Sequence, residues 1–213
     1  MTLQDMLVPT YVQMLGALSA WLGKAAEARP IGGEQALLTA RLAPDMFPLS
    51  TQVRFACVQA QEGVFRLRQQ AFPPSLEVLL DEGRNAAERP GSIADARARI
   101  AETIGIVDVA TAEPAEVDPA APIAHTLPQG MVFDLTAEQY VRDWALPQFY
   151  FHVMTAYAIL RRRASSWARL TMSRTCSRIF APALLPRSRR RAELVPPTGP
   201  RTLRALSRRC SRC

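Results

Sequence analysis

The sequence has few of the residues on which most metal sites and nucleophilic active sites depend. Its 213 residues include two histidines and four cysteines. It contains no glycine-rich phosphate loop and no nucleophile elbow. The one close pair of cysteines, Cys210 and Cys213, has neither a second pair nor histidines beside it, so it is weak evidence for zinc. The motifs therefore favour no reaction class.

Long apolar runs are also missing. No stretch approaches the ~20 apolar residues that cross a membrane, and the first residues lack the basic flank and apolar run of a signal peptide. Cys57 stands alone in an apolar helical pattern, as expected for a buried free thiol in a reducing compartment. We therefore expect a cytoplasmic protein without a membrane partner.

Acidic residues are nearly absent from the last quarter of the chain. The whole sequence has a formal net charge of +7, but residues 1–160 hold 11 basic and 18 acidic residues, a net −7. Residues 161–213 hold 15 arginines and one glutamate, a net +14, and their apolar residues are too sparse for a core. The composition predicts a folded domain over 1–163 and a disordered, arginine-rich tail over 164–213.

The tail has the composition of GC-rich DNA translated in the wrong frame. Its first residues, Ala164-Ser-Ser-Trp-Ala-Arg-Leu-Thr-Met-Ser-Arg-Thr-Cys-Ser, can be encoded by codons that read differently once two bases are dropped. The shifted frame gives Lys-Leu-Val-Gly-Lys-Ala-Asp-Tyr-Val-Ala-His-Leu-Phe, an ordinary protein sequence. We interpret the tail as a reading-frame product, and resequencing the gene across residues 160–164 tests this hypothesis.

Apolar residues recur at spacings of three and four along most of the first 163 residues, as in helices with one buried face. The pattern predicts long helices over about 2–28, from Ser50 to before Pro73, from Ser92 past Val107, and from Thr136 to about 163, with a short helix over 34–40. Four amphipathic helices with one long crossover favour an all-α fold, a four-helix bundle.

Local signals place several ends and connections. Thr2 with Asp5, Ser92 with Asp95, and Thr136 with Gln139 have the spacing of helix N-terminal caps, and Ser50 is a further candidate cap. Pro9 should bend the first helix or mark its start, and Pro147 should kink the last. Residues 110–124 read as an exposed connection, and 125–135 as a small hairpin before the last helix.

Two blocks of the sequence resemble a known family. They are Leu38-Thr-Ala-Arg-Leu-Ala-Pro-Asp-Met-Phe-Pro-Leu, followed by Gln52-Val53, and Ala145-Leu-Pro-Gln-Phe-Tyr-Phe-His-Val-Met-Thr-Ala-Tyr-Ala-Ile-Leu-Arg. Over about residues 1–161 the chain resembles DUF1993, an uncharacterised family of DinB-like helical bundles. The resemblance implies a DinB-like four-helix bundle, often dimeric, with no established activity. It also implies that a segment like the shifted-frame peptide follows the last helix.

The resemblance also bears on cofactors. Relatives in the wider superfamily bind a divalent metal through three histidines, and some are thiol-dependent transferases or isomerases. This chain has only His125 and His152, so it cannot supply that triad. We therefore expect no cofactor, with His152 and Asp45 as the remaining weak candidates for metal ligands.

The sequence suggests one candidate site, a pocket between the helices lined by Arg41, Asp45, His152 and Tyr157. His152 and Asp45, which lies in the 44–48 connection, can share a proton or a divalent ion, whereas the structural alternative is a buried His152 hydrogen-bonded to that same connection. Arg41 either pairs with Asp45 or points into the cleft as an anion clamp. The aromatic residues Tyr150, Phe151 and Tyr157 are core or dimer contacts rather than cofactor stackers.

Three functions are compatible with these features. The first is a DinB-like bundle that binds a small molecule, or acts on it weakly, in the pocket near Arg41, Asp45 and His152. The second is a non-catalytic homodimer with a structural or interaction role. The third is nucleic-acid binding through the basic tail, which requires that the tail is genuine and predicts a steep salt dependence.

Overall fold

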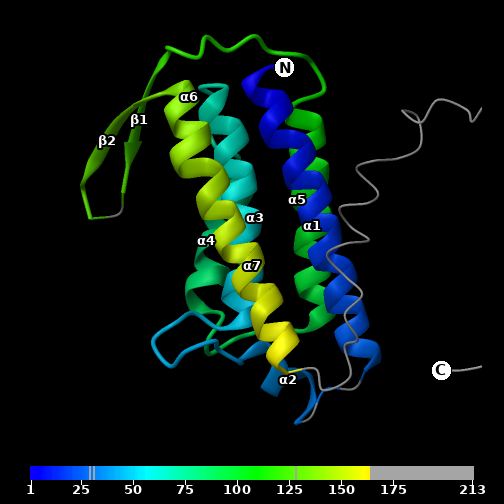
Figure 1. The fold of residues 1–213 in the computed structure, drawn as a ribbon. Helices are drawn as coiled ribbons and strands as arrows, with labels where there is room; N and C mark the ends of the chain where they lie inside the picture. Colours follow the sequence, from blue (N-terminus) through cyan, green and yellow to red (C-terminus); the bar gives the residue numbers. More distant parts are fainter. Residues whose placement is uncertain (29, 31, 128, 164–213) are drawn as a thin grey trace, which may run out of the picture.

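The computed structural model describes residues 1–28, 30, 32–127 and 129–163, and the predicted tail lies outside them. Four long helices run side by side: α1 (Leu3–Glu27), α3 (Leu49–Leu67), α5 (Ile93–Ala110) and α7 (Leu146–Arg163) (Figure 1). α1 and α3 each pack against both α5 and α7, so α5 and α7 are diagonal in the bundle. The prediction of a mostly helical bundle is confirmed.

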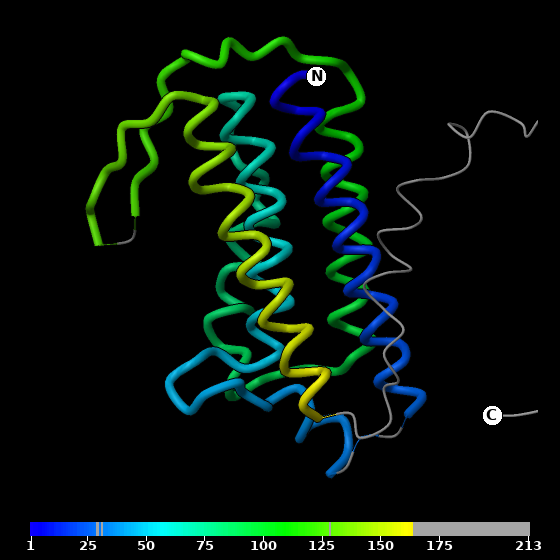
Figure 2. The backbone as a smooth tube through the Cα atoms, in the orientation of Figure 1, coloured from blue at the N-terminus to red at the C-terminus, as the bar shows by residue number. Residues whose placement is uncertain are grey.

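Shorter elements connect these helices. They are α2 (Gly33–Leu38), α4 (Pro74–Asn85), β1 (Pro122–Thr126), β2 (Val132–Thr136), α6 (Ala137–Gln139) and the π-helical turn η1 (Tyr140–Ala145). The strands β1 and β2 form the predicted antiparallel hairpin. Figure 2 shows the connection after α5 crossing to this hairpin at the end of the bundle where the chain starts.

The sequence-based prediction missed α4 because it took the pair Pro73-Pro74 as a helix stop only. In the structure Pro74 is the first residue of α4, where a proline costs no hydrogen bond and its fixed φ suits a helix. Leu76 and Leu79 are buried on this helix, which packs against α3. The same dipeptide therefore ends one segment and begins the next helix.

The three predicted N-terminal caps are confirmed, since Thr2, Ser92 and Thr136 each form both hydrogen bonds of a capping box. The prediction for Ser50 is wrong. α3 begins one residue earlier, after Pro48, and the buried hydroxyl of Ser50 donates instead to the carbonyl oxygen of Ala86, 2.8 Å away. This contact fixes the end of α4 against α3.

The two helical prolines have different effects. Pro9 lies inside α1, which begins at Leu3, so Pro9 does not mark the start of the helix. Before Pro147 the chain forms the π-helical turn η1. The N–H of Leu146 donates there to the carbonyl of Val141, five residues earlier. Proline supplies no N–H, so the helix ladder is necessarily interrupted at this point.

The core lies between the four long helices and contains large side chains that are almost completely buried, including Tyr11, Trp21, Tyr140 and Phe149. Gly63 on α3 lets Tyr11 of α1 pack directly against the α3 backbone, because a Cβ atom at this position would clash with the hydroxyl oxygen of Tyr11. Within the described residues, no helix is both long and apolar enough to cross a membrane.

Candidate functional site

His152 of α7 is 6% exposed and faces α3. Its Nδ1 lies 2.8 Å from Oε1 of Gln52 on α3, and an amide oxygen can only accept, so Nδ1 carries the proton. The Nε2 of Gln52 in turn donates to the carbonyl oxygen of Phe47, 3.3 Å away. His152 is therefore buried, as the structural alternative predicted, but its hydrogen bond goes to Gln52 of α3 and not to the 44–48 connection, to which Gln52 itself donates.

The imidazole of His152 is neutral. Burial disfavours the charged form and lowers the pKa of His152 from 6.5 to about 4. With Nδ1 protonated, Nε2 carries the remaining lone pair, which makes it a hydrogen-bond acceptor and a weak base.

Aromatic rings surround this histidine. Ring centroids lie 5.5 Å from His152 for Phe55 and 5.2 Å for Phe151, and Phe47 contacts Phe55 at 5.4 Å. Phe47 is 50% exposed and Phe151 49% exposed, so of the two roles predicted for Phe151 the structure excludes the core contact, and the dimer contact stays a prediction. We call Phe47, Phe55 and Phe151 the aromatic face.

The structure does not bring the four predicted pocket residues into one cavity. A cavity of about 450 Å³ is lined by Arg41 and Arg162 at the end of α7, but not by Asp45, His152 or Tyr157. Asp45 is exposed on its loop. Tyr157 is half-buried and stacks on Trp21, with ring centroids 4.9 Å apart.

The predicted pairing of Arg41 with Asp45 is wrong. The ion pairs of the described residues do not join these two side chains. The Nη1 of Arg41 donates instead to the carbonyl oxygen of Met46, and Nη1 of Arg162 donates to the carbonyl oxygen of Leu42, 2.8 Å away. Both arginines thus help to fix the loop between α2 and α3.

The three-histidine metal site of the wider superfamily does not fit these residues. Nδ1 of His152 is bonded to Gln52, and the ring packs edge-on between two phenylalanines. Across the described ranges, no group of three or more histidine, cysteine, aspartate or glutamate side chains is placed to hold a metal ion.

Cys57 is buried within the bundle, as predicted. Burial raises the pKa of its thiol to about 12, so the thiolate needed for nucleophilic attack is scarce at neutral pH. The structure gives this residue the role of a small apolar side chain.

A second buried histidine, His125, was not selected from the sequence. It is 4% exposed on β1, with its ring 4.4 Å from Trp144 and 5.7 Å from Tyr140. Neither ring nitrogen has a hydrogen-bond partner among the described residues. Burial and the nearby charge of Arg66 lower the pKa of His125 to about 4. On this strand Ile123 and His125 are buried and alternate with exposed residues. This alternation was the signal in the sequence that could have identified His125 as a buried residue.

The structure is similar to the crystal structure of a DinB family member protein from Shewanella denitrificans, with a TM-score of 0.56 and 28% sequence identity. That similarity covers 78% of this chain and 89% of the other. Residues 3–164 match the family described as Domain of unknown function (DUF1993), and the chain belongs to this family. A search of curated proteins found no match.

Proposed function

We propose that this protein is a non-catalytic bundle that forms a homodimer through the aromatic face. The observation that carries the proposal is the half-exposure of Phe47 and Phe151 beside the buried His152. Clusters of large apolar side chains on a protein surface often mark interaction sites. Aromatic residues are also enriched in the cores of protein interfaces.

The surroundings of the aromatic face support a rigid contact surface. Phe151 stands on α7, Phe55 on α3 and Phe47 on the loop before α3. The bond from Gln52 to Phe47 and the bond from Arg41 to Met46 hold that loop in place. A surface that is ordered before association loses less conformational entropy on binding.

Sedimentation equilibrium of the full chain is expected to show a dimer, and Phe151→Ser should weaken the dimer by about tenfold or more, because interface aromatics often dominate affinity. Phe72→Ser is the matched control, because Phe72 is also an exposed phenylalanine but is not part of the aromatic face. It lies between α3 and α4, and the guanidinium of Arg66 stacks over its ring. The proposal is contradicted if the parent chain is monomeric, or if Phe151→Ser and Phe72→Ser weaken the dimer equally.

Small-molecule binding is a second candidate, supported by the cavity beside Arg41 and Arg162. Arg163 also lines this cavity, and three guanidinium groups at one cavity favour an oxyanion. Inorganic phosphate should therefore bind the full chain, and Arg41→Gln should weaken binding by about tenfold, as expected for loss of a charge-assisted hydrogen bond. Arg89→Gln serves as the control, because Arg89 does not line this cavity. Unchanged phosphate affinity in Arg41→Gln argues against this site.

Four further expectations remain proposals. Nucleic-acid binding through residues 164–213 and the domain boundary after residue 163 both concern a segment outside the described residues. The reading-frame hypothesis is supported by the match to DUF1993, which spans residues 3–164. A cytoplasmic location is supported by the buried free thiol of Cys57.

A further inference from the structure

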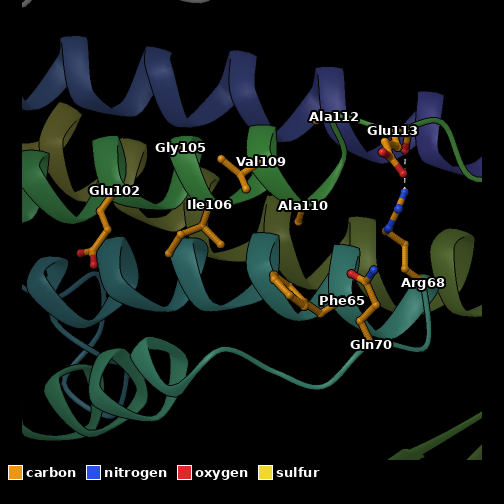
Figure 3. A pocket seen from close by; sticks show the side chains of 10 residues that line it. All are labelled: Phe65, Arg68, Gln70, Glu102, Gly105, Ile106, Val109, Ala110, Ala112 and Glu113. Atoms are coloured by element: carbon orange, nitrogen blue, oxygen red, sulfur yellow. Dashed lines mark hydrogen bonds between the residues drawn. The ribbon is translucent and has the colours of Figure 1, made fainter.

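An open groove runs between α3 and α5, away from the aromatic face. It has a volume of about 790 Å³, within the range of small-molecule sites. Figure 3 shows Ile106, Val109 and Ala110 of α5 along one side, with Phe65 of α3 opposite them. We call this cavity the α3/α5 groove.

Arg68 lies at one end of the groove and has no carboxylate partner among residues 1–28, 30, 32–127 and 129–163. Its Nη1 donates to the side-chain oxygen of Gln4 at 2.7 Å and to the backbone carbonyl of Glu113 at 3.1 Å, which are both neutral acceptors. The ion pairs of the described residues do not include Arg68. Its Nε is buried and lacks an acceptor in the same part of the chain. The guanidinium therefore has both charge and hydrogen-bonding capacity left over.

The other charged groups of the groove do not supply this partner. Glu102 lies at the opposite end, where its carboxylate accepts a hydrogen bond from Nη1 of Arg99 at 2.7 Å. Glu113 offers its backbone carbonyl to Arg68, and its side chain is exposed. Arg68 is thus a cationic side chain without an ion pair among the described residues, at one end of a groove with a mainly apolar wall.

We propose that the α3/α5 groove binds a medium-chain carboxylic acid, with the carboxylate on Arg68 and the acyl chain along α5. A guanidinium matches the planar geometry of a carboxylate and can form two parallel hydrogen bonds with it. The stretch of α5 from Glu102 to Ala110 spans about 12 Å, at ~1.5 Å per residue. This length suits the acyl chain of decanoate, which would cover apolar side chains that now face solvent.

Calorimetric titration of the full chain with sodium decanoate, below its micelle concentration, tests the proposal. Decanoate should bind, and decyltrimethylammonium, which has a cationic head on the same chain, should bind about tenfold more weakly or not at all. Arg68→Gln should lower the decanoate affinity by about tenfold or more, because a charge-assisted pair is lost. Equal binding of both amphiphiles, or no decanoate binding, overturns the proposal.

A second variant covers the case in which Arg68→Gln fails to fold. Val109 is 79% exposed on the groove wall, so Val109→Glu should fold normally while placing a carboxylate beside the acyl chain. We expect it to weaken decanoate binding, whereas Val78→Glu, at an exposed position of α4 outside the groove, should not. If both glutamate variants bind like the parent chain, the fatty acid binds elsewhere and the proposal fails.

Discussion

Replacing His152 by phenylalanine is expected to lower the free energy of unfolding by about 1–3 kcal/mol at pH 7, the usual cost of stranding a buried polar group. The stranded group is the side-chain oxygen of Gln52, which is itself buried and now accepts from Nδ1. The same substitution at His125 should be neutral or stabilising. There it removes two buried nitrogens without partners and keeps a ring between Trp144 and Tyr140.

Urea denaturation at pH 7 measures the change in the free energy of unfolding for each variant and shows whether the two changes differ in sign. Each variant serves as the control for the other, because both replace a buried histidine by the same apolar ring. If His125→Phe proves as destabilising as His152→Phe, His125 has a hydrogen-bond partner in solution, and the assignment of its nitrogens as unpaired is wrong.

The two histidines also predict how stability depends on pH. Both have a folded-state pKa of about 4, below the ordinary value of 6.5. As the pH falls below about 6.5, the unfolded chain takes up protons that the folded chain cannot. The free energy of unfolding should therefore keep its full value above about pH 6.5. Between pH 6.5 and pH 4 each histidine should lower it by about 1.4 kcal/mol per pH unit. Either phenylalanine variant should remove about half of that decline.

Gly63→Ala is expected to destabilise the bundle by about 1–3 kcal/mol, the usual penalty for overpacking a core. The added Cβ would lie 2.3 Å from the hydroxyl oxygen and 3.1 Å from the ring carbons Cε2 and Cζ of Tyr11, so α1 and α3 must separate slightly. This cost should exceed the gain in helix propensity that alanine otherwise brings.

A double-mutant cycle with Tyr11→Phe isolates the clash. The hydroxyl of Tyr11 is buried without a hydrogen-bond partner in the described part of the chain, so Tyr11→Phe alone should be neutral or stabilising. In that background Gly63→Ala should cost less than in the parent chain. The control is Gly16→Ala, at an exposed position of α1 with no atom within 4 Å of the new Cβ, which should stabilise by up to about 1 kcal/mol. Additive effects of Gly63→Ala and Tyr11→Phe contradict the predicted contact.

The features predicted correctly from the sequence are those set by local chemistry. Each capping box at Thr2, Ser92 and Thr136 depends on residues three apart, so its spacing is visible in the chain. The hairpin was also visible, because two extended runs flank a Pro/Gly turn. Ser50 has the right residue type for a cap, but the N-cap is Pro48, two residues earlier, and tertiary packing directs the Ser50 hydroxyl to Ala86.

The site depends on contacts between distant residues, and here the sequence was a poorer guide. His152 and Gln52 are 100 positions apart, and no spacing rule pairs them. Arg41 and Asp45 looked like partners because they are close in sequence, yet the backbone of Met46 satisfies Arg41. The α3/α5 groove has no motif at all, because it arises from two helix surfaces that meet only after folding.

The diagonal arrangement of α5 and α7 affects how many ligand molecules the proposed dimer could bind in its α3/α5 grooves. A contact made through Phe151 on α7 leaves the Val109 wall on α5 away from the association surface, because α1 and α3 stand between these helices. Two chains joined in this way keep both grooves open and equivalent. A titration should then give one ligand per chain and a Hill coefficient of about 1, at protein concentrations above and below the dissociation constant of the dimer.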